Sequence, residues 1–175
     1  MNSTIDEILL LKAKEIGEFF KQELIDEHIE QGHKLTGNFV RSIDYDVLSD
    51  KSTITILLEY AAYGAVLENG VSAANIPFGG NTSKKVSQYI EALKNWATLR
   101  GFVKPLSAAF AIAKTHKKEG MPSRGSYAFS KNTRRKNFQT FVLQSNKDFL
   151  KDFISPEVAA KITTQLFDLI NNTTL

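Results

Sequence analysis

The chain contains no cysteine among its 175 residues. Disulfide scaffolds, cysteine-ligated zinc sites, iron–sulfur clusters and thiol nucleophiles are therefore excluded, because each of them needs cysteine sulfur. Long apolar runs are also missing, since no stretch approaches the roughly 20 apolar residues that cross a bilayer. The first 20 residues lack the basic region and continuous apolar run of a signal peptide. We expect a soluble protein that is compatible with a reducing compartment.

Residues that carry catalytic chemistry are scarce. The chain has three histidines, and His28 and His33 are five positions apart, which does not place two ligands on one helical face. His116 stands among lysines, an unfavourable place for a metal cation. No nucleophile elbow, P-loop, dinucleotide-binding fingerprint or zincin motif occurs in the sequence. We therefore predict structural or solvated histidines, no enzyme activity, no metal and no cofactor.

Two weaker candidate sites remain. The loop Gly79–Ser83 precedes a predicted helix and offers free amides to an anion, but it lacks the Lys-Ser/Thr ending of a P-loop and a strand directly before it. Asp44 and Asp46 share one face of a predicted strand, where two carboxylates could hold a divalent cation. Alternating polar residues are, however, the normal exposed side of a half-buried strand. A solvated face is the favoured interpretation.

Positive charge is concentrated in one segment. Residues 114–136 contain eight lysines and arginines against Glu119 alone, a net charge of +7, whereas the 14 basic and 18 acidic residues elsewhere leave −4. This asymmetry suggests a polyanion or an acidic partner, and a solvated basic loop explains it equally well. Tyr127, Phe129 and the nearby Phe138 add the aromatic groups that single-strand binders use for base stacking. These aromatics would serve equally to anchor a loop, and no helix-turn-helix or RNA-recognition signature accompanies them.

The hydrophobic pattern predicts an α+β protein: a long N-terminal helix and a small antiparallel sheet packed by several helices. An apolar stripe indicates a helix of about 27 residues from Thr4 towards Gly32, about 40 Å long. Residues 41–58 alternate and are rich in β-branched residues, which predicts an antiparallel hairpin with its turn at 49–52. Residues 60–70 predict a short helix or turn, and residues 71–82 a loop. Further predicted helices cover 86–97, 105–119 and 155–169, with an exposed loop over 120–137.

Two short motifs carry a family resemblance. Thr36-Gly37-Asn38-Phe39-Val40-Arg41-Ser42-Ile43 stands directly before the first predicted strand. It resembles the T-G-x-L-x-x-S-I element of phage head–tail joining proteins, the neck or tail-completion family of long-tailed phages. The stretch YAAYGAVLENG at 60–70 is similar to the family's Y-A-x-Y-x-E-x-G stretch. The resemblance spans roughly residues 5–115, and its motif residues are Thr36, Gly37, Asn38, Ser42, Tyr60, Tyr63, Glu68 and Gly70.

The resemblance implies a structural virion protein that performs no chemistry. Such a subunit forms a ring in the phage neck, between the portal–connector complex and the tail tube, around the passage taken by DNA. The symmetry of long tails implies a hexamer. The implied partners are further copies of the chain, connector- or portal-side neck proteins, the tail tube protein and, without sequence specificity, packaged DNA. The protein would be made in the bacterial host cytoplasm and reside in the virion, with no membrane partner.

The same reasoning divides the chain into a joining core at 1–115, a basic loop at 116–140 and a C-terminal helical extension at 141–175. We expect the loop to be mobile in the free subunit, because it buries little and repels itself. Charge reversal at 134–136 is expected to leave the fold intact, since these positions fall outside every apolar stripe. The alternative function is a nucleic-acid-binding module that uses 114–136 without sequence specificity. The candidate contacts with partners or DNA are Lys117, Lys118, Arg124, Lys131, Arg134, Arg135 and Lys136.

Overall fold

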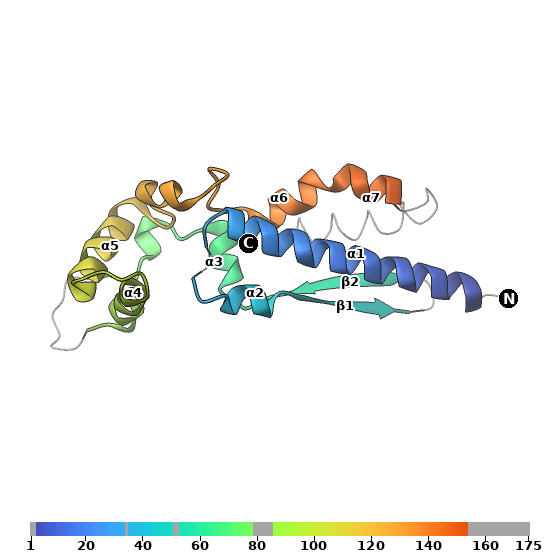
Figure 1. Ribbon diagram of the computed structural model, residues 1–175, viewed down its shortest axis with the longest axis horizontal. Coiled ribbons are helices and arrows are strands. Elements are labelled where there is room, and N and C mark those ends of the chain that lie inside the picture. Colours follow the sequence, from blue (N-terminus) through green and yellow to red (C-terminus); the bar gives the residue numbers. More distant parts are fainter. Residues whose placement is uncertain (1–2, 34, 51–52, 79–85, 154–175) are drawn as a thin grey trace.

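The computed structural model describes residues 3–33, 35–50, 53–78 and 86–153. Figure 1 shows an elongated molecule in which α1 lies along the β1–β2 hairpin, whereas α4 and α5 form a separate end. The architecture is α+β, as the hydrophobic pattern predicts. Its helices, 3₁₀ helices (η) and strands follow in the order α1 (Ser3–Glu30), α2 (Asn38–Ser42), β1 (Asp44–Ser49), β2 (Ile54–Glu59), α3 (Gly64–Asn69), η1 (Ala73–Asn75), α4 (Gln88–Leu99), α5 (Pro105–Glu119), η2 (Arg124–Phe129), α6 (Phe138–Ser145) and α7 (Lys147–Phe153).

Helix α1 is 28 residues long, which corresponds to about 42 Å at 1.5 Å per residue. Ile16, Phe20 and Leu24 lie on one face and are buried. Beyond the end of the helix, Gly32 turns the chain with a φ of 72°, a left-handed conformation that glycine adopts without strain. A Cβ at this position would also collide with the carbonyl oxygen of Phe129. The predicted long helix and its stop are confirmed.

Strands β1 and β2 form a two-stranded antiparallel sheet in which Tyr45 pairs with Leu58 and Val47 with Ile56. These side chains are partly buried, and Ile56 and Leu58 pack against the main core. Helix α1 approaches the sheet closely at Gly17, where a Cβ would collide with the ring of Tyr45. The predicted hairpin is confirmed, with α1 covering the face from which these side chains project (Figure 1).

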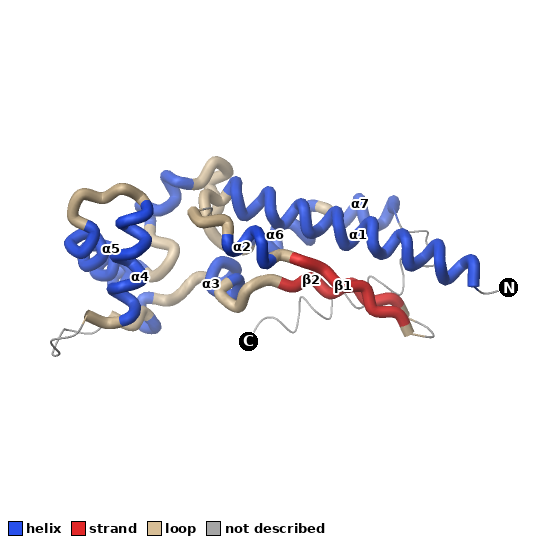
Figure 2. The backbone as a smooth tube through the Cα atoms, turned by 60° about the horizontal axis from the view of Figure 1, so that its bottom comes forward, coloured by secondary structure: helices blue, strands red, loops and turns tan. Residues whose placement is uncertain are grey.

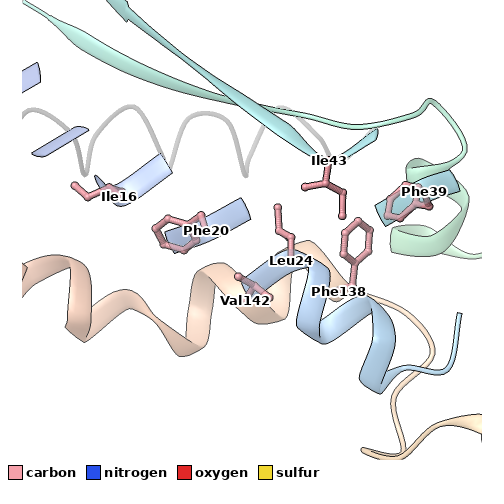
Figure 3. Packing of buried hydrophobic residues seen from close by; sticks show 7 residues of the cluster. All are labelled: Ile16, Phe20, Leu24, Phe39, Ile43, Phe138 and Val142. Carbon is pink, nitrogen blue, oxygen red and sulfur yellow. The ribbon is translucent and has the colours of Figure 1, made fainter. Parts of the chain in front are cut away.

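The main hydrophobic core joins parts of the chain that are far apart in the sequence (Figure 3). Three of its buried side chains come from α1, two from the segment around α2 and two from α6. The rings of Phe39 and Phe138 meet edge to face, with centroids 5.7 Å apart at 78°, a favourable arrangement for aromatic pairs. Helix α6 therefore belongs to the same core as the N-terminal helix. The seven residues are Ile16, Phe20, Leu24, Phe39, Ile43, Phe138 and Val142.

Helices α4 and α5 pack against each other at one end of the molecule (Figure 2). Ser87 caps α4 by accepting a hydrogen bond from the Ile90 amide at 3.3 Å, and Pro105 occupies the first turn of α5. Ala109 and Ala113 of α5 are fully buried together with Ile90, so small side chains allow a close helix contact. Both predicted helices are confirmed.

The structure differs from the sequence prediction over residues 120–137. Where the pattern predicts an exposed loop, Arg124–Phe129 form the 3₁₀ helix η2, and the residues that follow are hydrogen-bonded to the end of α1. Three other predictions lie outside the described residues: the helix at 155–169, the anion loop Gly79–Ser83 and the apolar side chains up to residue 8. Among the helices that the structure describes, none is long and apolar enough to cross a membrane.

Candidate interaction surfaces

The first motif forms a tight turn between α1 and the hairpin. Gly37 directly precedes α2 with a φ of 75° and a ψ of 3°, so the predicted tight conformation at this glycine is confirmed. Thr36 Oγ1 accepts a hydrogen bond from the Asn38 amide at 3.4 Å. The side chain of Asn38 accepts a further hydrogen bond from Arg41, one turn along. These exposed contacts fix the path of the chain into the buried part of α2.

Ser42 and Phe39 connect the first motif to the second. Ser42 Oγ donates a hydrogen bond to the Phe39 carbonyl at 2.7 Å and accepts one from the Ala61 amide at 3.0 Å. The ring of Phe39 has its centroid 5.0 Å from that of Tyr63 and 5.7 Å from that of Tyr60. One hydrogen-bonded hydroxyl and one aromatic cluster therefore bring the two motif halves together. We call this contact region the motif junction, defined by residues 36–43 and 60–70.

Glu68, a buried acid of the second motif, caps helix α6. Its carboxylate accepts hydrogen bonds from the amides of Gln139 at 2.9 Å and Thr140 at 3.3 Å, and from the Thr140 hydroxyl. Its backbone carbonyl accepts another from the Asn137 amide at 2.9 Å. A carboxylate is stabilising at a helix N-terminus because it satisfies free amides and complements the helix dipole. Glu68 thus attaches α6 to α3.

Tyr60 and Gly70 complete the motif junction. The Tyr60 hydroxyl donates a hydrogen bond to the side chain of Gln139 in α6. Gly70 ends α3 with a φ of 73°, and a Cβ there would collide with the carbonyl oxygen of Met121. The next residue, Val71, pairs with Met121 in a β-bridge. The motif residues that sequence reasoning singled out are thus brought together, and their contacts connect structural elements.

One exposed part of the basic segment lies at the end of α5 and in η2. Lys118 and Arg124 are exposed. Lys117, also exposed, donates hydrogen bonds to the carbonyl oxygens of Ala74 and Ile76 at 3.5 and 3.4 Å. These three cations remain accessible to an acidic partner or to phosphate.

Glu27 of α1 binds another part of the basic segment. Its side chain is only 7% exposed, and its carboxylate accepts two hydrogen bonds from Arg134, from Nε and Nη2, both at 2.9 Å. Gln31 and Asn132 donate to the same carboxylate at 2.8 and 3.0 Å. Burial alone would raise the pKa of Glu27, but the hydrogen bonds from Arg134 and Gln31 outweigh it and hold the pKa below its ordinary value. The ion pair therefore joins α1 to a segment that is distant in the sequence.

The remaining basic residues also contact the end of α1. Arg135 Nη1 donates to the Gln31 carbonyl at 2.6 Å, and the Gln31 side chain donates to the Lys136 carbonyl at 3.0 Å. Lys131 Nζ lies 3.0 Å from a carboxylate oxygen of Glu30. Residues 134–136 lie outside the apolar stripes, yet hydrogen bonds and an ion pair attach them to α1. Apolar periodicity does not identify these positions, because polar and charged contacts hold them in place.

The histidines next to this region are neutral. His28 is 2% exposed, and its ring centroid lies 4.5 Å from that of Phe39 and 5.4 Å from that of His33. Burial, together with the positive charge of Arg135, lowers the pKa of both His28 and His33 to about 4. His116 Nδ1 lies 2.7 Å from a tyrosine hydroxyl. In the described ranges, no group of three or more His, Asp or Glu side chains is placed to hold a metal ion.

An apolar cleft of about 500 Å³ opens between α3, α4, α5 and η2. Its walls include Trp96, Phe102, Ile112, Met121 and Phe129. Sequence reasoning missed this cleft, because Phe102 and Phe129 stand in segments read as loops and only tertiary packing brings them to α5. The available signal was a group of large apolar residues from the end of α4 to the start of α5, which are exposed in the structure: Leu99, Phe102, Val103 and Leu106.

Comparisons with protein-family models, curated proteins and solved structures give no significant match to this chain. The family resemblance therefore rests on the two sequence motifs. The fold defines an α+β protein in which those motifs form one partly buried junction, beside an apolar cleft and a partly exposed basic segment.

Proposed function

We propose that this protein is a structural component of the neck of a long-tailed phage, where copies of it form a ring that joins the portal–connector complex to the tail tube. The observation that carries the proposal is the packing of the two motif halves. Ser42 accepts a hydrogen bond from Ala61, and Phe39 packs against Tyr60 and Tyr63. Because the two motifs meet in one junction, they act as one structural unit. This is expected if both motifs belong to one structural element that the family shares.

The surface around the cleft supports an assembling role. Leu99, Phe102, Val103 and Leu106 are all exposed at the α4–α5 end, and Val103 is 94% exposed. Large apolar side chains gathered at one end of a small protein mark contact sites for other proteins. In the proposed ring this end contacts a neighbouring subunit or an adjoining neck protein.

The proposed ring surrounds the passage of DNA, and the exposed basic residues are the candidates for phosphate contact. Lys117, Lys118 and Arg124 are accessible, and contacts of this kind neutralise phosphate charge without reading a sequence. The competing nucleic-acid-binding module would use the basic segment at 114–136. Arg134 and Lys131 instead form ion pairs with acids of α1, which favours the joining role.

Electron microscopy of a phage in which this gene is disrupted tests the proposed function. We expect DNA-filled heads and complete tails that remain separate, and recovery of joined particles when the wild-type gene is supplied in trans. Infectious particles with normal necks in the absence of the protein would contradict the proposal. Loss of heads or of tails themselves, in place of a failure to join them, would contradict it as well.

A further inference from the structure

Two arginines lie in or beside the wall of the apolar cleft. The guanidinium of Arg100 lies over the rings of two wall residues, 5.5 Å from the Trp96 centroid and 5.9 Å from that of Phe129. Arg135 lines the same cleft. Within the described part of the chain, neither arginine forms an ion pair with a carboxylate. The cleft therefore suits an occupant that combines apolar side chains with negative charge.

Arg135 has no carboxylate partner among the described residues. Its Nε is buried and has no hydrogen-bond partner, and burial together with the charge of Arg100 lowers the pKa of the Arg135 guanidinium. The charge of the exposed Arg100 adds to that of the half-buried Arg135, which makes the local potential positive. A carboxylate brought to Arg100 would relieve this repulsion.

The outer face of the β1–β2 hairpin has the opposite character. In the strand register Asp44 lies directly opposite Glu59, and like charges at such positions are destabilising. Lys21 forms an ion pair with Asp44 at 3.0 Å. Among the described residues no ion pair reaches Asp46 or Glu59. This face therefore carries negative charge that its own surroundings only partly neutralise.

An apolar side chain accompanies these acids. Leu48 is 53% exposed and stands two residues beyond Asp46, on the same face of β1. The spacing between side chains at i and i+2 on a strand is about 7 Å. If Leu48 of another copy entered the cleft, the carboxylate of Asp46 would therefore come near Arg100. A volume of about 500 Å³ is large enough to receive side chains of this size.

We propose that the hairpin of one copy docks into the cleft of the next, with Leu48 entering the apolar cavity and Asp46 pairing with Arg100. The inference deepens the proposed function and rests on it in one respect, that copies of the chain assemble with one another. Figure 1 shows the hairpin extending away from the α4–α5 end, so the two surfaces belong to different regions of one copy. A contact between two different surfaces is head-to-tail, and repetition of such a contact closes into a ring when the rotation allows.

Charge exchange across the contact tests the inference in the full-length protein. Sedimentation velocity and native mass measurement should show rings for the wild type. Arg100→Glu alone and Asp46→Arg alone should each weaken association roughly tenfold or more. Mixing the two variants should restore rings with an even number of subunits in which the variants alternate, because each cleft then meets a hairpin of opposite charge. The double variant should restore them in a single chain, and Lys151→Glu, at an exposed pair within α7, should leave assembly unchanged.

Trp96 gives a local readout, since it is the only tryptophan of the chain and lines the cleft. Its fluorescence should shift to shorter wavelength and become less accessible to acrylamide when rings form. Should Arg100→Glu fail to fold by circular dichroism, Leu48→Lys tests the same contact from the exposed hairpin and should also block assembly.

Three results would overturn the inference. If wild-type chains stay monomeric at all accessible concentrations, the proposed contact between copies does not form. Rings that tolerate both single charge reversals would locate the interface elsewhere and leave the proposed neck function standing. Single variants that fail to assemble and are not restored by mixing would show that residues 46 and 100 do not meet. Electron microscopy of the gene-disrupted phage tests the proposed neck function separately.

Discussion

Removal of Arg134 should destabilise the fold substantially, although the residue belongs to a segment that reads as an exposed loop. Its guanidinium makes two hydrogen bonds at 2.9 Å to Glu27 and lies 3.5 Å from the centroid of the Phe141 ring. It therefore connects α1 to α6 across the core. Arg134→Ala would leave the buried carboxylate of Glu27 with its amide donors Gln31 and Asn132 alone.

The expected magnitude follows from the burial of the pair. Removing one partner of a fully buried ion pair costs about 3–5 kcal/mol, because the other charge is left without compensation. The Arg134 side chain is 36% exposed, so water reaches the site once the side chain is gone. We therefore expect a loss of about 2–3 kcal/mol in the free energy of unfolding. The matched control is Lys131→Ala, which breaks the exposed pair with Glu30 and should cost about 0.5 kcal/mol or less.

Urea denaturation followed by circular dichroism measures both losses, and its pH dependence adds a second criterion. The folded-state pKa of Glu27 lies below its ordinary value of 4.5. The stabilisation is thus complete above pH 4.5 and is lost as the pH falls through the folded-state pKa. The difference between wild type and Arg134→Ala should shrink in that acidic window. Equal small losses for Arg134→Ala and Lys131→Ala at neutral pH would show that the Glu27–Arg134 pair contributes no more than an exposed ion pair.

Three further substitutions test the motif junction and its surroundings. Gly37→Val should lower the free energy of unfolding by about 1–3 kcal/mol, since valine is strained at a φ of 75°. Gly125→Val, in open space without a positive φ, is its control, and equal melting temperatures would refute the strain argument. Glu68→Ala should cost about 1–2 kcal/mol by uncapping α6, and an unchanged urea midpoint would contradict that role. The pKa of His28 is about 4 in the folded protein, below its ordinary value of 6.5. The free energy of unfolding therefore falls as the pH drops through this window, by about 1.4 kcal/mol per pH unit. His28→Phe should flatten the dependence, and an identical pH profile would show that the imidazole is not buried and neutral.

Apolar periodicity predicted the elements whose contacts are apolar. The stripe through Ile16, Phe20 and Leu24 gave α1, and the alternation around Tyr45 gave the hairpin, because burial selects those spacings directly. Gly37 was identified from its place between a helix and a strand, and the structure gives it the left-handed conformation. For these segments the local pattern and the tertiary structure agree.

Such patterns do not predict the polar and long-range contacts of the structure. Glu27 and Arg134 are 107 positions apart, and nothing in the charge of either residue identifies the other as its partner. The capping of α6 by Glu68 depends likewise on a contact across 71 positions. The cleft is a third case, because it exists only where α3, α4, α5 and η2 meet. Interactions of this kind depend on how elements dock, which single-chain periodicity does not specify.

Labelling of intact phage particles with gold-conjugated antibody against this protein tests the proposed neck function most directly. If the protein joins head to tail, gold should lie at the junction of head and tail, at one position along the particle axis, and particles that lack the gene product should carry no label. Label distributed over the capsid or at the distal end of the tail would contradict it, and so would purified particles that carry no label.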